Sequence, residues 1–247
     1  MELIQRVLYT YRKMHLHQQF YKQLFLGIGI LLVSFVANYG ANLYASQREG
    51  NVVNDMILDL LPVVNLDYIY LEGFLVFIVF IVILGLYRPN RLPFMLKTIG
   101  LFILIRSFFI TLTHLSLPLP GLEALKYAPT GSMVQKFSSG NDLFFSGHTG
   151  LPFLISLIFW KDKLLRYIFL GMSIFFGIAV LFAHVHYSID VFAAFFITYA
   201  IYQLAVWLFT KDHRLFHLVQ REVSKLALRG KKRGQLAETS DQPTSHS

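Results

Sequence analysis

Residues Leu66–Tyr87, LDYIYLEGFLVFIVFIVILGLY, stay apolar over almost their whole length. A helix needs about 20 such residues to cross the hydrocarbon core of a bilayer, so this stretch predicts a membrane-spanning helix. The whole chain has the same character, because 55% of its 247 residues are hydrophobic and only 15% are charged. A soluble domain carries roughly 25% charged residues. Lipid, rather than water, must therefore solvate much of the folded protein.

Five further apolar stretches accompany this one, and together they predict an all-α, polytopic membrane protein with six transmembrane helices. The predicted spans are Leu24–Tyr44, Leu66–Tyr87, Phe94–Leu115, Phe145–Trp160, Leu164–Ala183 and Ser188–Phe209. The fourth span is short and begins with the polar sequence SGHT, which indicates that its outer end lines a cavity. We expect residues 24–210 to form the membrane domain. Residues 1–23 then form an interfacial amphipathic segment, and residues 211–247 form a basic, partly disordered tail.

The distribution of basic residues predicts the orientation in the membrane. Of the 22 Lys and Arg residues, eighteen lie in the two terminal segments and in the loops 88–97 and 161–166, whereas three lie in the opposite loops. Cytoplasmic loops collect Lys and Arg, so both termini are expected in the cytoplasm. The same bias accounts for the net charge of +8, and a nucleic-acid partner is not needed to explain it.

Two polar segments lie on the predicted non-cytoplasmic side. The sequence FFSGHTG places Ser146, Gly147 and His148 at the outer end of the fourth span. The sequence AHVHYSIDV places His184, His186 and Asp190 at the start of the sixth. His186 and Asp190 are four residues apart, so a helix that begins there presents both on one face.

Two histidines and a carboxylate suit phosphoryl transfer. One imidazole attacks phosphorus while the other protonates the departing alkoxide. The carboxylate holds one imidazole nitrogen and leaves the other nitrogen to react. The N–H groups at the start of the fourth span would attract a phosphate, and Gly147 would let it approach the backbone.

A zinc site is an alternative for the same residues, since His and Asp are common zinc ligands. The SGHT turn favours phosphate over metal, and we predict no metal and no other cofactor. The chain has no cysteine, which excludes disulfides, thiolate metal sites and a cysteine nucleophile.

Arg106 lies within the third predicted span, where a charged side chain costs about 2.5 kcal/mol or more. An ion pair with an acidic residue such as Glu72, or snorkelling to the interface, would explain it structurally. A clamp for phosphate or carboxylate beneath the histidines would explain it functionally.

Three segments, taken together, resemble a known family. Asn141–Thr149, NDLFFSGHT, is similar to the pattern C-G-D-x-x-x-S-G-H-T, with Asp142 and His148 matching. His184–Val191, HVHYSIDV, is similar to H-x-H-Y-[ST]-x-D-V. Ile105–Gly121 is similar to R-x-x-x-x-x-T-x-L-P-x-P-G and gives Arg106 a matching position. Over residues 60 to 205 the chain resembles the sphingomyelin synthase branch of the lipid phosphate phosphatase (PAP2-like) superfamily.

The resemblance implies six spans around a cavity, with His186 as the nucleophile and Asp190 as its activator. His148 then assists the leaving group and afterwards the acceptor hydroxyl. The headgroup phosphate passes through a covalent histidine intermediate to ceramide in the synthases, leaving diacylglycerol, and to water in the phosphatases. The expected supporting or substrate-binding residues are Arg106, Asp142, Ser146, Gly147, His184 and Tyr187.

The chain also departs from the family's patterns. The family's Cys before Gly-Asp is absent, with Ser139-Gly140-Asn141 in its place. The element P-P-L-P-D is reduced to Leu61-Pro62 and, further on, Asp67. Arg88-Pro89 lacks the preceding Lys of the K-x6-R-P motif of the plain phosphatases. The last departure favours the synthase branch.

We therefore predict an integral membrane enzyme that transfers a headgroup phosphate from a phospholipid to a hydroxyl of a lipid such as ceramide or diacylglycerol. The predicted site faces the non-cytoplasmic side. A phosphatase or phospholipase C-type hydrolase is the first alternative. A transporter or a non-catalytic homologue is the second. A transporter often has internal repeats, and none is evident between the halves of this chain.

Overall fold

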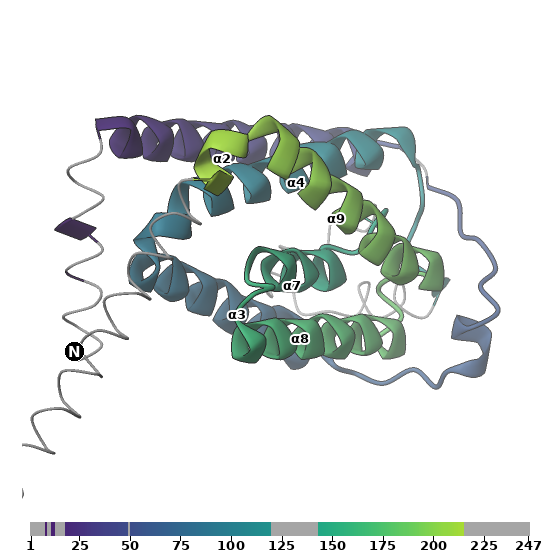
Figure 1. The fold of residues 1–247 in the computed structure, drawn as a ribbon. Helices are drawn as coiled ribbons and strands as arrows, with labels where there is room; N and C mark the ends of the chain where they lie inside the picture. Colours follow the sequence, from purple (N-terminus) through teal and green to yellow (C-terminus); the bar gives the residue numbers. More distant parts are fainter. Residues whose placement is uncertain (1–7, 9–10, 13–17, 49, 120–142, 215–247) are drawn as a thin grey trace, which may run out of the picture.

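The computed structural model describes residues 8, 11–12, 18–48, 50–119 and 143–214. Over these residues the regular structure is helical (Figure 1). In chain order the elements are α2 (Gln18–Ser46), η1 (Leu58–Leu60), α3 (Asp67–Tyr87), η2 (Pro89–Arg91), α4 (Leu92–Leu112), α7 (Gly147–Ile158), α8 (Lys163–Phe182) and α9 (Ser188–Leu208).

The predicted fold class is confirmed: the protein is an all-α, polytopic, integral membrane protein. Five of the described helices, α2, α3, α4, α8 and α9, are long and apolar enough to cross a bilayer. The fourth predicted span corresponds to α7, which has only 12 residues. The helix α2 begins at Gln18, within the segment that the sequence assigns to the membrane interface.

The short helix α7 lies inside the ring of longer helices (Figure 1) and contacts α4, α8 and α9. Nine of its 12 residues are buried, whereas fewer than half of the residues in the most apolar window of each long helix are buried. Because protein surrounds α7, it does not need the length of a helix that faces lipid.

Small residues allow α7 to pack closely against its neighbours. A Cβ atom on Gly150 would lie 2.9 Å from the ring of Phe102 and 2.9 Å from Oγ1 of Thr198. These contacts hold α7 against α4 and α9. On the α8 side, the Ser173 hydroxyl donates a hydrogen bond of 2.7 Å to the carbonyl of Thr149.

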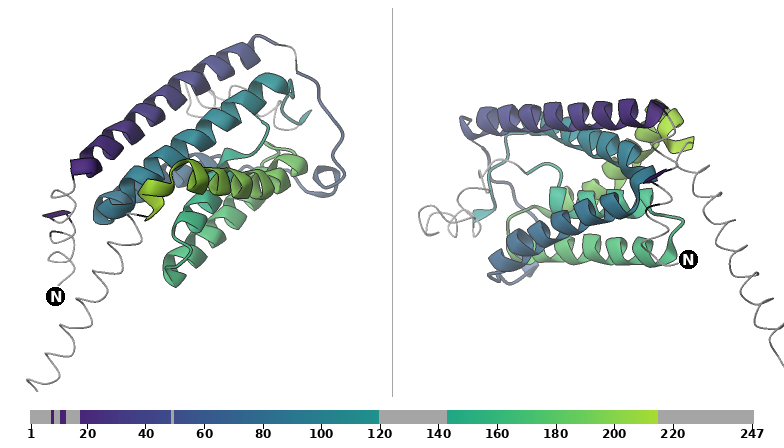
Figure 2. Two further views of the ribbon diagram at one scale, coloured as in Figure 1. Left: turned by 45° about the horizontal axis from the view of Figure 1, so that its top comes forward. Right: turned by 90° about the vertical axis from the view of Figure 1, so that its left-hand side faces the viewer.

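The helices α2 and α4 pack side by side along one flank of the bundle (Figure 2). Gly100 makes this close packing possible, because a Cβ there would lie 2.8 Å from Ile30. Near the start of α4 the Lys97 ammonium is 1% exposed and donates a hydrogen bond of 2.6 Å to Asp212. It also donates to Gln23 of α2. A buried charge needs such partners, so this cluster joins α2, α4 and the segment after α9.

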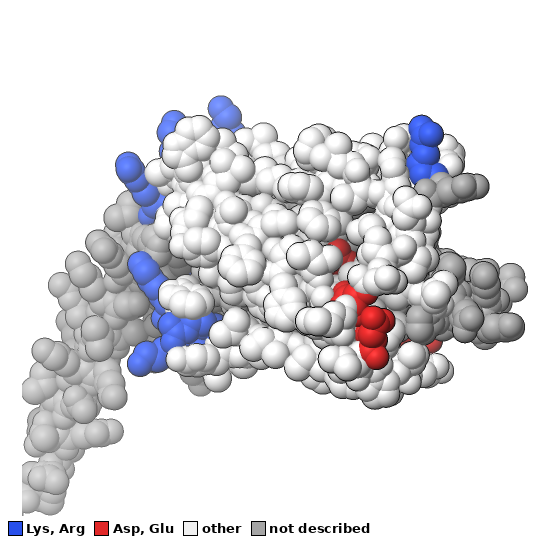
Figure 3. Space-filling model, turned by 90° about the vertical axis from the view of Figure 1, so that its right-hand side faces the viewer, with Lys and Arg blue, Asp and Glu red and all other residues white. Residues whose placement is uncertain are grey.

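Charge separates the two ends of the bundle. We call the end where α7 and α9 begin the histidine end, and the end where α3 and α7 finish the basic end. Figure 3 shows Lys and Arg side chains mainly at one end of the visible face and Asp and Glu side chains near the other. The acidic residues of the histidine end include Asp55, Asp59, Asp67 and Glu72. The predicted orientation in the membrane rests on this separation of charge. Which end faces the cytoplasm stays a prediction.

Candidate active site

Two histidine rings face each other at the histidine end. His148 stands in the first turn of α7, and His186 lies in the loop just before α9. Their ring centroids are 6.1 Å apart, with an interplanar angle of 66°. The structure thus brings together two residues that are far apart in the chain, as the sequence predicts for a paired acid and nucleophile.

Asp190 stands behind His186. Its Oδ2 lies 3.5 Å from Nδ1 of His186 and accepts a hydrogen bond of 3.0 Å from the Tyr187 amide. The His–Asp distance is longer than a good N–H···O bond, and within the described residues His186 Nδ1 and Asp190 Oδ1 have no hydrogen-bond partner. Catalytic hydrogen bonds are often long without substrate and tighten with it. The carboxylate is fully buried and is positioned to support an imidazolium.

The start of α7 is joined to the start of α9 through Ser146. The Ser146 side chain caps α7 by accepting a hydrogen bond of 3.4 Å from the Thr149 amide. Its own amide donates 3.0 Å to the carbonyl of Asp190. Ser146 is fully buried, so its observed contacts hold the two histidine-bearing segments in register.

Arg106 crosses the N-terminus of α7. Its Nε donates a hydrogen bond of 2.9 Å to the carbonyl of Phe145. A Cβ on Gly147 would lie 3.4 Å from Nε and 3.7 Å from Cζ of Arg106. The absence of a side chain at Gly147 therefore lets the guanidinium lie against the first turn of α7, beside His148.

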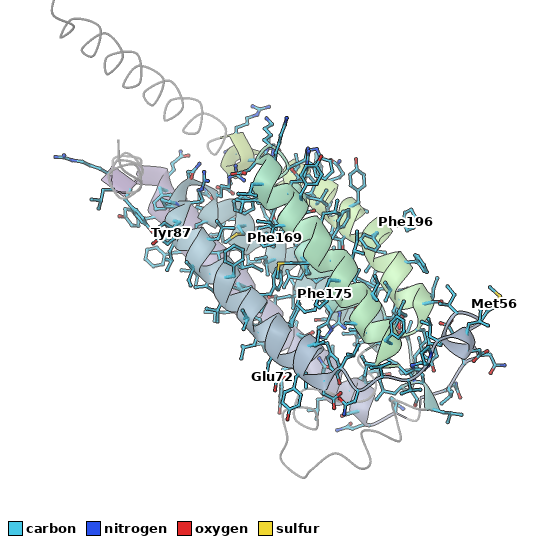
Figure 4. The ribbon with its side chains drawn as sticks, turned by 90° about the horizontal axis from the view of Figure 1, so that it is seen from below. Met56, Glu72, Tyr87, Phe169, Phe175 and Phe196 are labelled. Atoms are coloured by element: carbon cyan, nitrogen blue, oxygen red, sulfur yellow. The ribbon has the colours of Figure 1, made fainter. Side chains whose placement is uncertain are left out.

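The ion pair between Arg106 and Glu72, which the sequence allowed, is not the arrangement observed. Glu72 is exposed, and in Figure 4 it points away from the bundle on α3. Arg106 is instead oriented towards Phe145 and Gly147. This position brings a cation to the end of α7 that already attracts anions.

Aromatic side chains of α3 surround His148 on its other side. The ring centroid of Phe74 lies 4.5 Å from that of His148, and the centroid of Tyr70 lies 5.8 Å away. These contacts fix the ring orientation, and they supply an apolar wall opposite His186.

His184 and Tyr187 were expected to support or bind the substrate, and their observed contacts are with the backbone. His184 has a positive φ of 53°, and its ring nitrogens lie 3.3 Å from the carbonyls of Phe182 and Leu58. The Tyr187 hydroxyl donates 3.0 Å to Ser116 and accepts 3.2 Å from the Val53 amide. Burial raises the pKa of Tyr187. Both side chains hold the loops around His186 in place.

Asp55 is a residue of the site that the sequence did not single out. One carboxylate oxygen accepts a hydrogen bond of 2.6 Å from the Ser188 amide, at the start of α9. The other accepts 3.0 Å from Ile57 and 3.2 Å from Leu58. Burial raises the pKa of Asp55, but the hydrogen bonds from Ser188, Leu58 and Ile57 together hold it below its usual range. Asp55 thus stabilises the helix start between His186 and Asp190 as an anion.

The chain was compared with known protein families, curated proteins and solved structures. Residues 139–207 match the family described as PAP2 superfamily C-terminal. This match supports membership in the PAP2 superfamily. It spans His148, His186 and Asp190, and it also includes Asp142, which lies outside the described residues. No curated protein and no solved structure is significantly similar to the chain.

The zinc alternative requires ligands that converge on one point. Within the part of the chain that the structure describes, no group of three or more His, Asp or Glu residues is arranged to hold a metal ion. The two ring nitrogens of His184 contact carbonyls, so a chelate from His184 and His186 would require this ring to turn. The observed arrangement suits a phosphate between His148, His186 and Arg106 better.

Proposed function

We propose that the protein transfers the phosphate-bearing headgroup of a phospholipid to a lipid hydroxyl, through a covalent intermediate on His186. Membership in the PAP2 superfamily suggests a lipid phosphatase or phosphotransferase. The observation that carries the proposal is the pairing of His148 and His186, 6.1 Å apart between ring centroids, with the buried carboxylate of Asp190 behind His186.

In the first step, an imidazole nitrogen of His186 attacks the phosphorus atom, and the bond from phosphorus to the glycerol oxygen breaks. His148, in its protonated form, gives a proton to the departing alkoxide, which leaves as diacylglycerol. Asp190 stabilises the positive charge that develops on His186, because its Oδ2 lies 3.5 Å from Nδ1. This division of roles follows from the carboxylate, which supports a cation on His186; among the residues that the structure describes, His148 has no carboxylate partner.

Arg106 and the N-terminus of α7 stabilise the charge on the phosphoryl oxygens. The guanidinium lies against Gly147, so a phosphate beside His148 would meet both the cation and the free N–H groups of the first helical turn. Donors that are fixed before the reaction contribute most to such a transition state. Their positions are fixed by the hydrogen bonds of Arg106 to Phe145 and of Ser146 to Asp190.

In the second step, neutral His148 accepts the proton of an acceptor hydroxyl, and the resulting alkoxide attacks phosphorus and releases His186. A lipid hydroxyl gives transfer, whereas water gives hydrolysis. The predicted orientation places this reaction at the non-cytoplasmic leaflet.

A transfer assay with labelled lipid tests the proposal. Purified protein is reconstituted with phosphatidylcholine or phosphatidylethanolamine labelled in the headgroup, with and without ceramide or diacylglycerol. We expect the wild-type protein to move the label to the hydroxyl of the added lipid. The variants His186→Ala, His148→Ala and Asp190→Ala should form no labelled product. The matched control is His114→Gln, because His114 lies at the same end but packs on Tyr44, with ring centroids 5.9 Å apart.

The outcomes separate the candidate functions. Label that appears only in a water-soluble product would identify a hydrolase and contradict the transferase. Full activity of His186→Ala would overturn the covalent mechanism. Acid-labile label retained on the wild-type protein but not on His186→Ala is the expected sign of the intermediate.

A further inference from the structure

A cavity lies in the half of the bundle nearest the basic end. Its volume is about 490 Å³, within the range of about 300–1,000 Å³ that is usual for small-molecule sites. It is lined by Arg91, Phe153, Leu157, Ile158, Trp160, Lys161, Tyr199, Tyr202, Gln203 and His213. These residues come from η2, α7, the turn between α7 and α8, the second half of α9 and the segment after it, so the cavity is separate from the histidine pair.

The wall of this cavity is cationic. Arg91 and Lys161 contribute positive charge, and none of the described lining residues is acidic. Arg91 is only 2% exposed and is fixed in place, because it donates 3.2 Å to the carbonyl of Ile158 and stacks 4.2 Å from the Phe159 ring centroid. A buried arginine held in this way is a rigid binding group for an anion.

The nearest acidic residues are each paired with a cation outside the cavity lining, and Asp162 also interacts electrostatically with Arg91. Asp162 lies 3.4 Å from Arg88, and Asp212 lies 2.6 Å from Lys97. These pairs reduce the negative potential that the two carboxylates would otherwise add beside the cavity. The local charge therefore favours a ligand that carries a negative group.

The rim of the cavity is aromatic and partly exposed. Trp160 is 48% exposed and Tyr199 is 51% exposed, and Gln203 donates 2.8 Å to the Tyr199 hydroxyl. Trp and Tyr prefer the depth where lipid headgroups meet acyl chains. Since the turn at Lys161 lies between two membrane helices, the ligand that fits is charged at one end and apolar at the other.

We propose that this cavity binds the phosphate-bearing headgroup of an anionic phospholipid from the leaflet at the basic end. Basic pockets between transmembrane helices are suited to such headgroups. The phosphate lies beside Arg91, Lys161 and His213, and the acyl chains pass the aromatic rim into the bilayer. This site does not depend on the reaction proposed for the histidine pair.

Trp160 provides a built-in reporter, because the chain has two tryptophans and the second, Trp207, is 73% exposed. A Trp207→Phe protein in phosphatidylcholine nanodiscs is titrated with phosphatidic acid that carries brominated acyl chains. Brominated phosphatidylcholine at the same mole fraction is the reference. We expect saturable quenching of Trp160 by the anionic lipid beyond that of the reference, because bromine must approach the indole to quench it.

Lys161→Gln should lower the apparent affinity for the anionic lipid about fivefold, the effect of one basic residue near a charged membrane surface. Lys163→Gln is the matched control, since Lys163 is exposed, begins α8 and does not line the cavity. Lys161→Arg keeps the positive charge and should retain the preference for the anionic lipid over phosphatidylcholine. An unchanged Trp160 emission spectrum without brominated lipid shows that each variant keeps its fold here.

Three results would overturn the proposal. Equal quenching by the two brominated lipids would mean that the cavity does not select an anion. An equal loss of affinity for the anionic lipid in Lys161→Gln and Lys163→Gln would mean that general surface charge causes the preference for this lipid. Competition by inorganic phosphate, at an ionic strength matched with chloride, would identify a site for a soluble anion rather than a lipid.

Discussion

Asp55→Asn tests whether the loop before α3 holds the histidine end together. In the wild type both carboxylate oxygens accept hydrogen bonds, from the Ser188 amide on one side and from Ile57 and Leu58 on the other. An asparagine has only one such oxygen, so its NH₂ group must face an N–H donor on one side. Hydrogen bonds to charged groups contribute about 1.5–3 kcal/mol each, and Asp55 is partly exposed, so we expect a loss of about 2 kcal/mol.

Amide hydrogen exchange in the peptide that spans residues 184–192 measures this loss directly. A loss of about 2 kcal/mol in local stability corresponds to roughly 30-fold faster exchange of the amides at the start of α9. Asp59→Asn is the matched control, because Asp59 is exposed on the same loop. Headgroup transfer should fall in Asp55→Asn, since His186 and Asp190 flank the loosened amide.

The pH dependence follows from the lowered pKa of Asp55. A carboxyl group whose pKa is lower in the folded state stabilises the fold above its unfolded pKa of about 3.9, and the contribution is lost as the pH falls through the folded value. The difference in local stability between the wild type and Asp55→Asn should therefore be constant from about pH 5 upwards and shrink below about pH 4. Unchanged exchange protection in Asp55→Asn at neutral pH would refute the role of this contact.

Three further predictions concern other parts of the molecule. Arg106→Gln should lower the rate of headgroup release by roughly 100-fold, because it removes the cation beside the phosphate, whereas Arg106→Lys should be less severe; equal rates for wild type and Arg106→Gln in single-turnover measurements would contradict the clamp. Gly150→Ala should destabilise the protein by about 1–3 kcal/mol, measured by denaturant unfolding in detergent, since the new Cβ would lie 2.9 Å from Phe102 and Thr198; Gly29→Ala, where the space is open, should be tolerated. Met56→Cys, in a chain with no cysteine, places a thiol at a site that is 78% exposed at the histidine end (Figure 4), and it should react with an impermeant maleimide added to intact cells; reaction only after permeabilisation would reverse the predicted orientation.

The membrane spans could be predicted from the sequence because they depend on local composition. Leu66–Tyr87 was expected to be helical, and α3 covers Asp67–Tyr87, since an apolar stretch in lipid must satisfy its backbone groups internally. The shortness of α7 was visible as the short fourth apolar stretch and its polar start SGHT. Its full enclosure by α4, α8 and α9 depends on tertiary packing, which hydropathy does not report.

The histidine pair could be predicted because its residues occur in compact motifs. The spacing of His186 and Asp190 predicted that the two side chains lie together, and Nδ1 and Oδ2 are 3.5 Å apart, although His186 precedes α9 and does not stand on it. Arg106 was recognisable as a charge within a span. Asp55 could not be found in this way, because its bond to Ser188 joins segments that are 133 residues apart, and no local pattern marks it. The backbone contacts of His184 were equally unpredictable, since they depend on a positive φ and on a carbonyl from η1.

The edge-on contact of His148 with Tyr70 and its tilted contact with Phe74 would also set the depth of the proposed reaction. These residues lie one to two turns inside α3, which begins at Asp67, so His148 is about 5–10 Å along that helix from its start at the histidine end. The polar region of a leaflet has about this thickness. The chemistry would then occur at the level of the glycerol esters, where water is scarce and the hydroxyl groups of neighbouring lipids are concentrated. Such a location would give a lipid alcohol a kinetic advantage over water without any residue that recognises it.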